Sequence, residues 1–281
     1  MSLSAYDISH MTIVPKRHYG RMLGAALVLA ALVAVVHAFA VGQIEWSYVG
    51  EFLTVPVILR GLVNTVVMAV MAMVLGIILG VLFAVMRLSA NPVLAATAVG
   101  YVWFFRAVPA LLQLLIWFNL ALIFPTMGIP GLFSVRTVDV MTPFVAALLG
   151  LGIQQGAFTA EVVRAGLLSV DRGQYEAAQS IGMPRLLMLR RIVMPQAMRV
   201  IIPPVGNEFI GMVKLTSLAS VIQYTEILHS AQNIYYANSR VIELLIVAAI
   251  WYLAVVTVLS LIQIRIERYF GRGIDARRTG P

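Results

Sequence analysis

The feature that most constrains this chain is a series of long apolar runs, because a helix needs about 20 mostly apolar residues to cross a bilayer. The sequence has six such runs, at residues 22–42, 57–86, 93–124, 142–163, 200–222 and 243–264. Of its 281 residues, 61% are hydrophobic and only 11% are charged, whereas about a quarter of the residues of a soluble domain are charged. The sequence therefore predicts an all-α integral membrane protein with about six transmembrane helices.

Two of the six runs contain residues that disturb a helix. Pro109 lies near the middle of 93–124, and proline lacks a backbone N–H, so we expect a kink there. The run 200–222 carries Pro203 and Pro204 together with Glu208 and Lys214. We expect this span to be broken or kinked, with its ionisable groups facing protein or a water-filled path rather than lipid.

The distribution of basic residues predicts the orientation of the chain. If the N-terminus is cytoplasmic, 15 of the 20 Lys and Arg residues fall in cytoplasmic segments, which agrees with the positive-inside bias of bacterial inner-membrane proteins. We therefore expect a cytoplasmic segment at 1–21, a transmembrane helix at 22–42 and a basic cytoplasmic tail at 271–281. The net charge of +8 is then a property of topology and requires no nucleic acid partner.

The residues that would carry catalysis are missing from the sequence. It has no cysteine, and its four histidines are scattered without the spacing of metal ligands. It has no GxxxxGK[ST] phosphate-binding loop and no nucleophile elbow. We therefore expect no catalytic residue, no metal site and no cofactor bound by this chain.

A polar island, residues 169–183, separates the fourth run from the fifth. Asp171 or Ser169 can cap a short helix there, and Gly182 suits a left-handed stop before Pro184. A second short helix is expected from 185 to Pro195. The small and apolar residues of the first helix can form one face that enters a groove of a partner; they are Tyr175, Ala177, Ala178, Ile181 and Met183. The alternative is a solvated loop between two spans.

The stretch EAAQSIG (176–182), followed after nine residues by IVMP (192–195), resembles the EAA signature of ABC importer permeases. Met194 stands where leucine is usual. In that family the segment is a coupling helix that docks on a separate ATPase subunit, and the resemblance implies the same here. The implied coupling residues are Gln174, Tyr175, Glu176, Ala177, Ala178, Ile181, Gly182 and Pro195.

Further stretches are similar to the branch of these permeases that serves polar amino acids and opines. They include GLVNTVVMAV (61–70) and FFRAVPALLQLL (104–115), and Leu215 departs from the aspartate that is common at its position. The resemblance covers about 57–270 and implies a five-helix permease core with a coupling region at 169–195, to which 22–42 is an addition. It also implies a second permease copy or paralogue, two ATPase subunits that bind ATP and Mg, and an extracytoplasmic binding protein.

Polar residues within the apolar runs are the candidates for substrate contact. An α-amino acid needs an anionic partner for its ammonium group and a cation or donors for its carboxylate, and Glu208 with Lys214 or Arg106 could supply these. The full set of candidates is Asn64, Arg106, Gln113, Gln155, Asn207, Glu208, Lys214 and Ser217. The alternative is that these groups brace the helix bundle.

Two short spacings predict local contacts within the bundle. Glu161 and Arg164 lie three residues apart on one helix and are expected to form an ion pair. Gly76 and Gly80 lie four apart and allow another helix to approach closely.

The predicted function is thus the permease subunit of an ATP-driven importer of a polar amino acid or a related small zwitterion. A stand-alone transporter driven by an ion gradient is the alternative, although it has no use for the cytoplasmic helices and the sequence has no visible inverted repeat. A membrane scaffold without transport activity leaves the intramembrane Glu208 and Lys214 unexplained.

Overall fold

The computed structural model describes residues 19–129 and 132–271, and it forms two compact units, Met1–Glu45 and Trp46–Pro281. The first unit contains α1 (Tyr19–Val41), a 23-residue helix that is long and apolar enough to cross a membrane and has no buried residue. This helix matches the predicted span 22–42.

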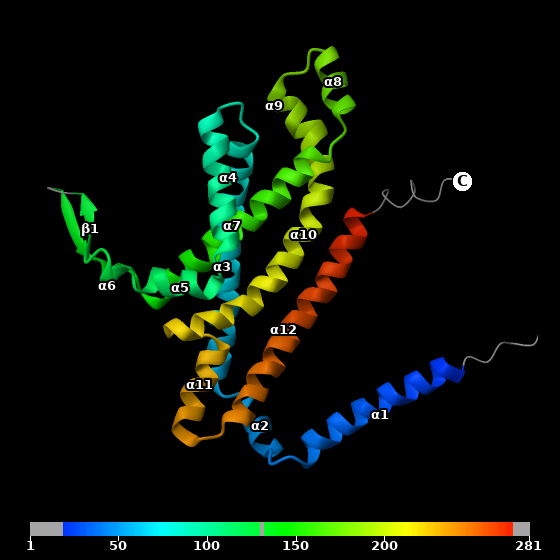
Figure 1. Cartoon of the computed structure of the whole chain (residues 1–281), viewed down its shortest axis with the longest axis vertical. Helices are drawn as coiled ribbons and strands as arrows, with labels where there is room; N and C mark the ends of the chain where they lie inside the picture. Colours follow the sequence, from blue (N-terminus) through cyan, green and yellow to red (C-terminus); the bar gives the residue numbers. More distant parts are fainter. Residues whose placement is uncertain (1–18, 130–131, 272–281) are drawn as a thin grey trace, which may run out of the picture. The chain divides into compact units, whose positions relative to one another are not determined.

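The second unit contains four more long apolar helices (Figure 1). They are α3 (Pro56–Arg87), α7 (Pro143–Leu168), α10 (Met194–Leu215) and α12 (Val241–Phe270). A sixth span is bent: α4 (Pro92–Ala107) and α5 (Ala110–Phe118) meet at an angle of 100°. The predicted all-α membrane fold with about six spans is therefore confirmed.

The bend between α4 and α5 confirms the kink expected at Pro109. Val108 has an extended backbone, with φ −82° and ψ 128°, because the ring of a following proline disfavours the helical conformation. The helix ends there and restarts in a new direction at Ala110.

The span that contains Pro203 and Pro204 was expected to be broken or kinked, and it is not broken there. The segment Arg185–Ile222 is one 38-residue span, built from α9 (Arg185–Met188), a π-helical segment (Leu189–Val193), α10 and a 3₁₀ segment (Thr216–Ile222). The two prolines lie inside α10, as membrane helices tolerate. Gln263 of α12 packs beside them and donates a hydrogen bond of 2.8 Å from Nε2 to the carbonyl oxygen of Pro203.

Several short elements were not anticipated from the sequence. They are α2 (Trp46–Phe52), a 3₁₀ turn (Leu120–Leu122), the antiparallel strands β1 (Thr126–Ile129) and β2 (Phe133–Arg136), α6 (Thr137–Val140) and α11 (Ile227–Asn238). The strands pair with Thr126 opposite Arg136. The second unit therefore begins at Trp46, about ten residues before the predicted core, because α2 packs on α12 and Trp251 Nε1 donates to the carbonyl oxygen of Leu53 at 2.9 Å.

The two predicted glycines bring α3 and α7 into close contact. A Cβ at Gly76 would lie 2.5 Å from Cγ of Gln155, and a Cβ at Gly80 would lie 2.6 Å from Cβ of Thr159. Only glycine leaves room for these side chains, so the small-residue face predicted on α3 is confirmed. It also fixes where Gln155 and Thr159 lie in the bundle.

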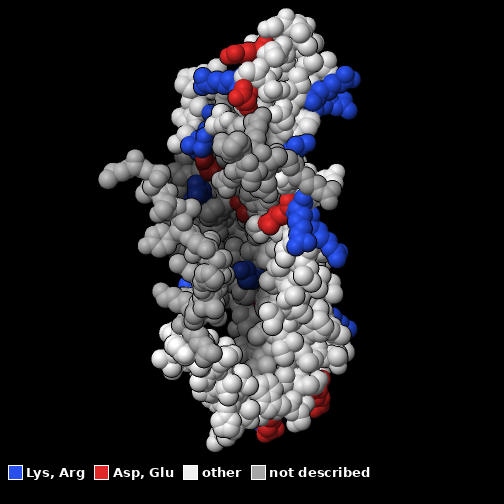
Figure 2. Space-filling model, turned by 90° about the vertical axis from the view of Figure 1, so that its right-hand side faces the viewer, with Lys and Arg blue, Asp and Glu red and all other residues white. Residues whose placement is uncertain are grey.

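The polar island and the short helices α2 and α11 lie at opposite ends of the second unit. In Figure 1, α8 (Arg172–Ser180) and α9 lie at the end where α12 finishes and where α3 turns into α4, and α11 and α2 lie at the other end. On the face seen in Figure 2, most Lys and Arg side chains gather over the upper half, the end that holds α8. The charge asymmetry of the sequence is therefore also an asymmetry of the folded unit.

Candidate functional site

Helix α8 forms as the capping residues predicted. The side chain of Asp171 accepts a hydrogen bond from the backbone N–H of Gly173 at 2.7 Å, and Gly182 has a φ of +70°. The backbone N–H of Met183 reaches back to the carbonyl oxygen of Ala178 at 3.0 Å, which closes the left-handed helix end that glycine favours. Of the two predicted N-caps, Asp171 is the one used.

The prediction that α8 presents one small apolar face is wrong, because the residues divide between two faces. Ala178 is 2% exposed and packs against the ends of α7 and α10, and the hydroxyl of Tyr175 donates to the carbonyl oxygen of Leu167 at 3.2 Å. Ala177 and Ile181 point away from the chain, and Ile181 is 74% exposed. One face anchors α8 to its own chain, and the other is open to a partner.

The remaining coupling candidates are also exposed. They are Gln174 and Glu176 in α8, Gly182 just after it, and Pro195 in α10. The prediction that a second short helix ends at Pro195 is wrong, because Pro195 lies in the first turn of α10 and the helix continues through it.

A cluster of charges lies near the α8 end of α7. Glu161 accepts hydrogen bonds from Nε and Nη2 of Arg164, at 3.2 and 2.8 Å, which confirms the predicted ion pair. A second partner was not predicted from the sequence: Arg87, at the end of α3, donates from Nη1 to the other carboxylate oxygen. The cluster therefore joins α3 to α7.

Glu208 lies in a polar cluster within the bundle. Its Oε2 accepts hydrogen bonds from Nε2 of Gln155 at 2.7 Å and from the hydroxyl of Thr159 at 3.1 Å. Gln155 and Glu208 were both predicted substrate residues, whereas Thr159 was not; its position one helical turn after Gln155 was the available signal. The cluster exists because Gly76 and Gly80 of α3 let this face of α7 come close.

Arg106, a further predicted substrate residue, lies beside the same face of α7. Its guanidinium carbon is 5.2 Å from the ring centroid of Phe158, which is within cation–π range. Phe158 directly precedes Thr159 in the sequence. The structure thus joins Gln155 directly to Glu208, and it places Arg106 beside the neighbouring residue Phe158.

The other five predicted substrate residues lie outside this cluster. Gln113 is buried and donates to the carbonyl oxygens of Phe105 and Val108, at 3.1 and 2.9 Å, so it fastens the bend between α4 and α5. Asn64 donates to the carbonyl oxygen of Thr225, Asn207 to the carboxylate of Glu267, and Ser217 to the carbonyl oxygen of Lys214. Lys214 itself is exposed, six residues beyond Glu208.

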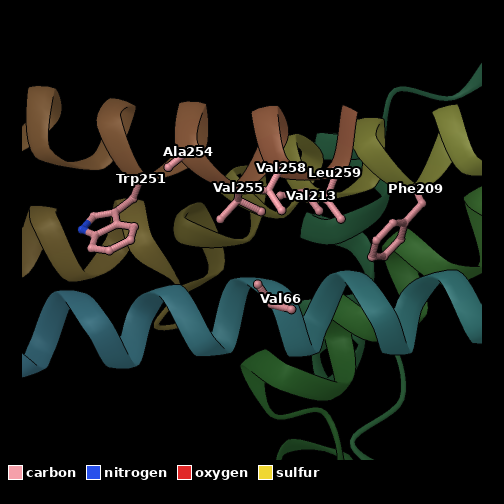
Figure 3. Close-up of a pocket in the computed structure, with 8 residues that line it drawn as sticks. All are labelled: Val66, Phe209, Val213, Trp251, Ala254, Val255, Val258 and Leu259. Carbon is pink, nitrogen blue, oxygen red and sulfur yellow. The ribbon is translucent and has the colours of Figure 1, made fainter. Parts of the chain in front are cut away.

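A pocket of about 290 Å³ between α3, α10 and α12 has a different character (Figure 3). Its lining is aliphatic and aromatic: Val66, Phe209, Val213, Trp251, Ala254, Val255, Val258 and Leu259. None of these residues carries a charge. The pocket therefore offers no partner for the ammonium or carboxylate group of an amino acid, and the cluster around Glu208 is the candidate substrate site.

Comparisons with known proteins agree with this arrangement. Residues 72–272 match the family described as the binding-protein-dependent transport system inner membrane component. The arginine transport system permease protein ArgU of Corynebacterium glutamicum is 36% identical over 262 residues, which cover 92% of this chain and 83% of that protein. The nopaline transport system permease protein NocM of Agrobacterium fabrum is 35% identical, with 80% of this chain and 92% of that protein covered.

A solved structure shares the fold. It is described as an amino acid ABC transporter with histidines, is 30% identical in sequence, and has a TM-score of 0.70, with 81% of this chain and all of that chain covered. The predicted family is therefore confirmed. The chain belongs to the inner membrane components of binding-protein-dependent transport systems, and it is a multi-pass permease subunit of the amino acid and opine branch of ABC importers, which work with an ATPase.

Proposed function

We propose that this chain moves a polar amino acid or a related small zwitterion, such as an opine, through the bacterial inner membrane, driven by two ATPase subunits that dock on α8. The open face of α8 carries this proposal, because Ala177 and the largely exposed Ile181 project from a helix that is anchored on its other side. In this assembly the ATPases bind ATP and Mg, an extracytoplasmic binding protein delivers the substrate, and a second permease copy or paralogue completes the pathway.

The α8 end is then cytoplasmic, together with both chain termini. The basic side chains at this end support that orientation, since Lys and Arg are retained on the cytoplasmic side of bacterial membrane proteins. The termini themselves, residues 1–18 and 272–281, lie outside the described residues.

The continuous helical segment from Arg185 to Ile222 suggests how ATPase movement reaches the substrate. Glu208 follows Arg185 by 23 residues, which is roughly 35 Å at 1.5 Å per residue. The anchored face of α8 contacts this segment through Val193 and Ala197. A displacement of α8 is therefore transmitted to Glu208 without a flexible joint, and ATP binding favours one of two positions of the segment.

The test is a pair of arginine substitutions on opposite sides of α8. We expect Ala177→Arg to place a charge in the docked face and abolish co-purification of the ATPase subunit and uptake. Gln179→Arg introduces the same charge about 160° around the helix, at a position that is also exposed, and we expect it to retain both. An Ala177→Arg permease that still co-purifies with its ATPase overturns the docking assignment.

Glu208 is tested by Glu208→Gln, which keeps the shape and removes the charge. We expect the ATPase subunit to remain bound and transport to fall sharply, because the substrate's cationic group loses its partner. Loss of assembly instead assigns Glu208 to bracing the bundle.

A further inference from the structure

A second pocket, larger than the one in Figure 3, lies toward the α8 end of the bundle, between α3, α7, α12 and the segment Arg185–Ile222. Its volume is about 580 Å³, within the range of about 300–1,000 Å³ that is usual for ligand sites. We call it the groove, and its lining residues are Ile77, Val81, Val85, Thr159, Val163, Leu167, Leu189, Met194, Met198, Ile201, Ile202, Val205, Gly206 and Ile266. Among these residues Thr159 has the one polar side chain, and its hydroxyl already donates to Glu208. The groove therefore suits a hydrocarbon chain and offers a zwitterion no partner.

The groove has nearly the depth of one membrane leaflet. On α3 its lining runs from Ile77 to Val85 and on α7 from Thr159 to Leu167, a rise of roughly 12 Å on each helix at 1.5 Å per residue. Half of a hydrocarbon core about 30 Å thick is about 15 Å. Val85 and Leu167 lie within two residues of the ends of α3 and α7. The groove thus begins where these helices reach the α8 end and finishes near the middle of the span, as an acyl chain of that leaflet does.

Positive charge borders the groove. Three arginines with exposed side chains adjoin lining residues in the sequence, namely Arg190, Arg199 and Arg265. Within residues 19–129 and 132–271 none of the three forms an ion pair. Glu267 also adjoins the lining, but its Oε1 already accepts two hydrogen bonds. Arginine binds phosphate through paired N–H donors, and its long side chain reaches the headgroup level while its stem stays among apolar groups. The border therefore favours an anionic phosphate group.

A second copy of this chain is a less suitable occupant of the groove. Two identical copies paired around a two-fold axis present the same surface to each other, so the arginines that border one groove would approach those of the other. Such a juxtaposition of like charges is unfavourable. Anionic lipids, in contrast, are attracted to basic residues at the cytoplasmic surface, and basic pockets between helices on that side bind their headgroups.

We propose that the groove binds one anionic phospholipid of the cytoplasmic leaflet, with an acyl chain along the lining and the phosphate near Arg190, Arg199 and Arg265. This inference rests on the proposed function for the orientation of the α8 end. Thr159, at the deep end of the groove, is one of the two residues that donate to Glu208. The bound chain therefore packs against a residue that holds Glu208 in place.

The experiment titrates the detergent-purified permease and ATPase complex with phosphatidylglycerol, or with phosphatidylcholine of the same acyl chains, and counts bound lipids by native mass spectrometry. We expect the wild-type complex to bind one phosphatidylglycerol per permease copy roughly tenfold to a hundredfold more tightly than phosphatidylcholine. Each arginine near an anionic headgroup contributes about fivefold, which corresponds to about 1 kcal/mol. The triple variant Arg190→Gln, Arg199→Gln and Arg265→Gln should lose this preference.

Matched variants separate the groove from the rest of the surface. Val81→Phe fills the groove and should remove the tight binding of phosphatidylglycerol, whereas Val74→Phe adds the same ring at another exposed position of α3 and should leave it unchanged. Arg172→Gln, Arg185→Gln and Arg268→Gln together remove three exposed arginines that do not adjoin the lining. This second triple variant should keep the preference.

Three results overturn the inference: equal binding of the two lipids by the wild-type complex, a preference that survives in the first triple variant, or tight phosphatidylglycerol binding that survives in Val81→Phe. Separation of the permease copies in Val81→Phe, visible in the same spectra, also overturns it and assigns the groove to contact between copies. The ATPase subunits are counted in the same spectra. A complex that fails the lipid test but retains its ATPase and its uptake leaves the proposed function standing.

Discussion

The close contact of α3 with α7 makes a quantitative prediction for Gly76. In Gly76→Ala the new Cβ would lie 2.5 Å from Cγ and 2.8 Å from Cβ of Gln155, so either the two helices separate or Gln155 moves. Overpacking of this kind costs about 1–3 kcal/mol. If Gln155 moves away from Glu208, a hydrogen bond to a charged group is lost as well, which is worth about 1.5–3 kcal/mol.

The matched control is Gly100→Ala, in the middle of α4. No atom lies within 4 Å of a Cβ at Gly100, and replacing a glycine inside a helix by alanine is worth about 0.5–1 kcal/mol. Both variants add one methyl group to a spanning helix, but Gly76→Ala should lower the free energy of unfolding, whereas Gly100→Ala should leave it unchanged or raise it.

Thermal unfolding of the purified permease in detergent measures the stability of both variants. A chain of this size shifts its midpoint by about 2–4 °C per kcal/mol, so we expect Gly76→Ala to unfold roughly 2–12 °C lower and Gly100→Ala to unfold at the same temperature or a few degrees higher. Equal midpoints for the two variants would refute the packing argument, and with it the reason that Gln155 and Thr159 lie beside Glu208.

Two further predictions concern the α4–α5 bend and the segment of β1, β2 and α6. Gln113→Leu removes two hydrogen bonds, to the carbonyl oxygens of Phe105 and Val108, in apolar surroundings, and should lower the free energy of unfolding by about 1–3 kcal/mol in the same unfolding assay. Gln154→Leu removes one longer bond of 3.3 Å and should cost less. A larger loss of stability in Gln154→Leu than in Gln113→Leu would contradict the role of Gln113 at the bend. The guanidinium of Arg136 holds the pKa of the Asp139 carboxyl below its usual value, so any stability from this pair is complete at neutral pH and is lost only as the pH falls through that lowered pKa. Asp139→Asn should therefore leave the pH dependence of uptake between about pH 6 and 8 unchanged. A pH dependence that differs from that of the wild-type permease over this range would contradict the assignment of a lowered pKa to Asp139.

Much of the fold follows from local features of the sequence. The length of each apolar run predicts a span, Pro109 predicts the bend, and Asp171 with Gly182 predicts both ends of α8. The ion pair of Glu161 with Arg164 follows from a spacing of three residues. Each of these depends on residues close together in the chain, where backbone geometry alone determines the outcome.

Other features required the tertiary structure. Pro203 and Pro204 do not break their helix, and Gln263, 60 residues later, donates a hydrogen bond to the carbonyl oxygen of Pro203. The residues of α8 divide into an anchored and an open face because the ends of α7 and α10 cover Tyr175 and Ala178. A sequence pattern gives the composition of a helix, but it does not say which side of that helix the rest of the chain covers.

The candidate site divides in the same way. The sequence by itself determined the permease family, and it named Arg106, Gln155 and Glu208 among eight polar candidates, because charged and amide groups stand out against apolar spans. Only the tertiary structure joined Gln155 of α7 to Glu208 of α10 and placed Gln113 at the α4–α5 bend. The physical reason is that hydrogen bonds and charge pairs depend on distances of a few ångströms between helices, and those distances are fixed by how Gly76 and Gly80 let the helices pack.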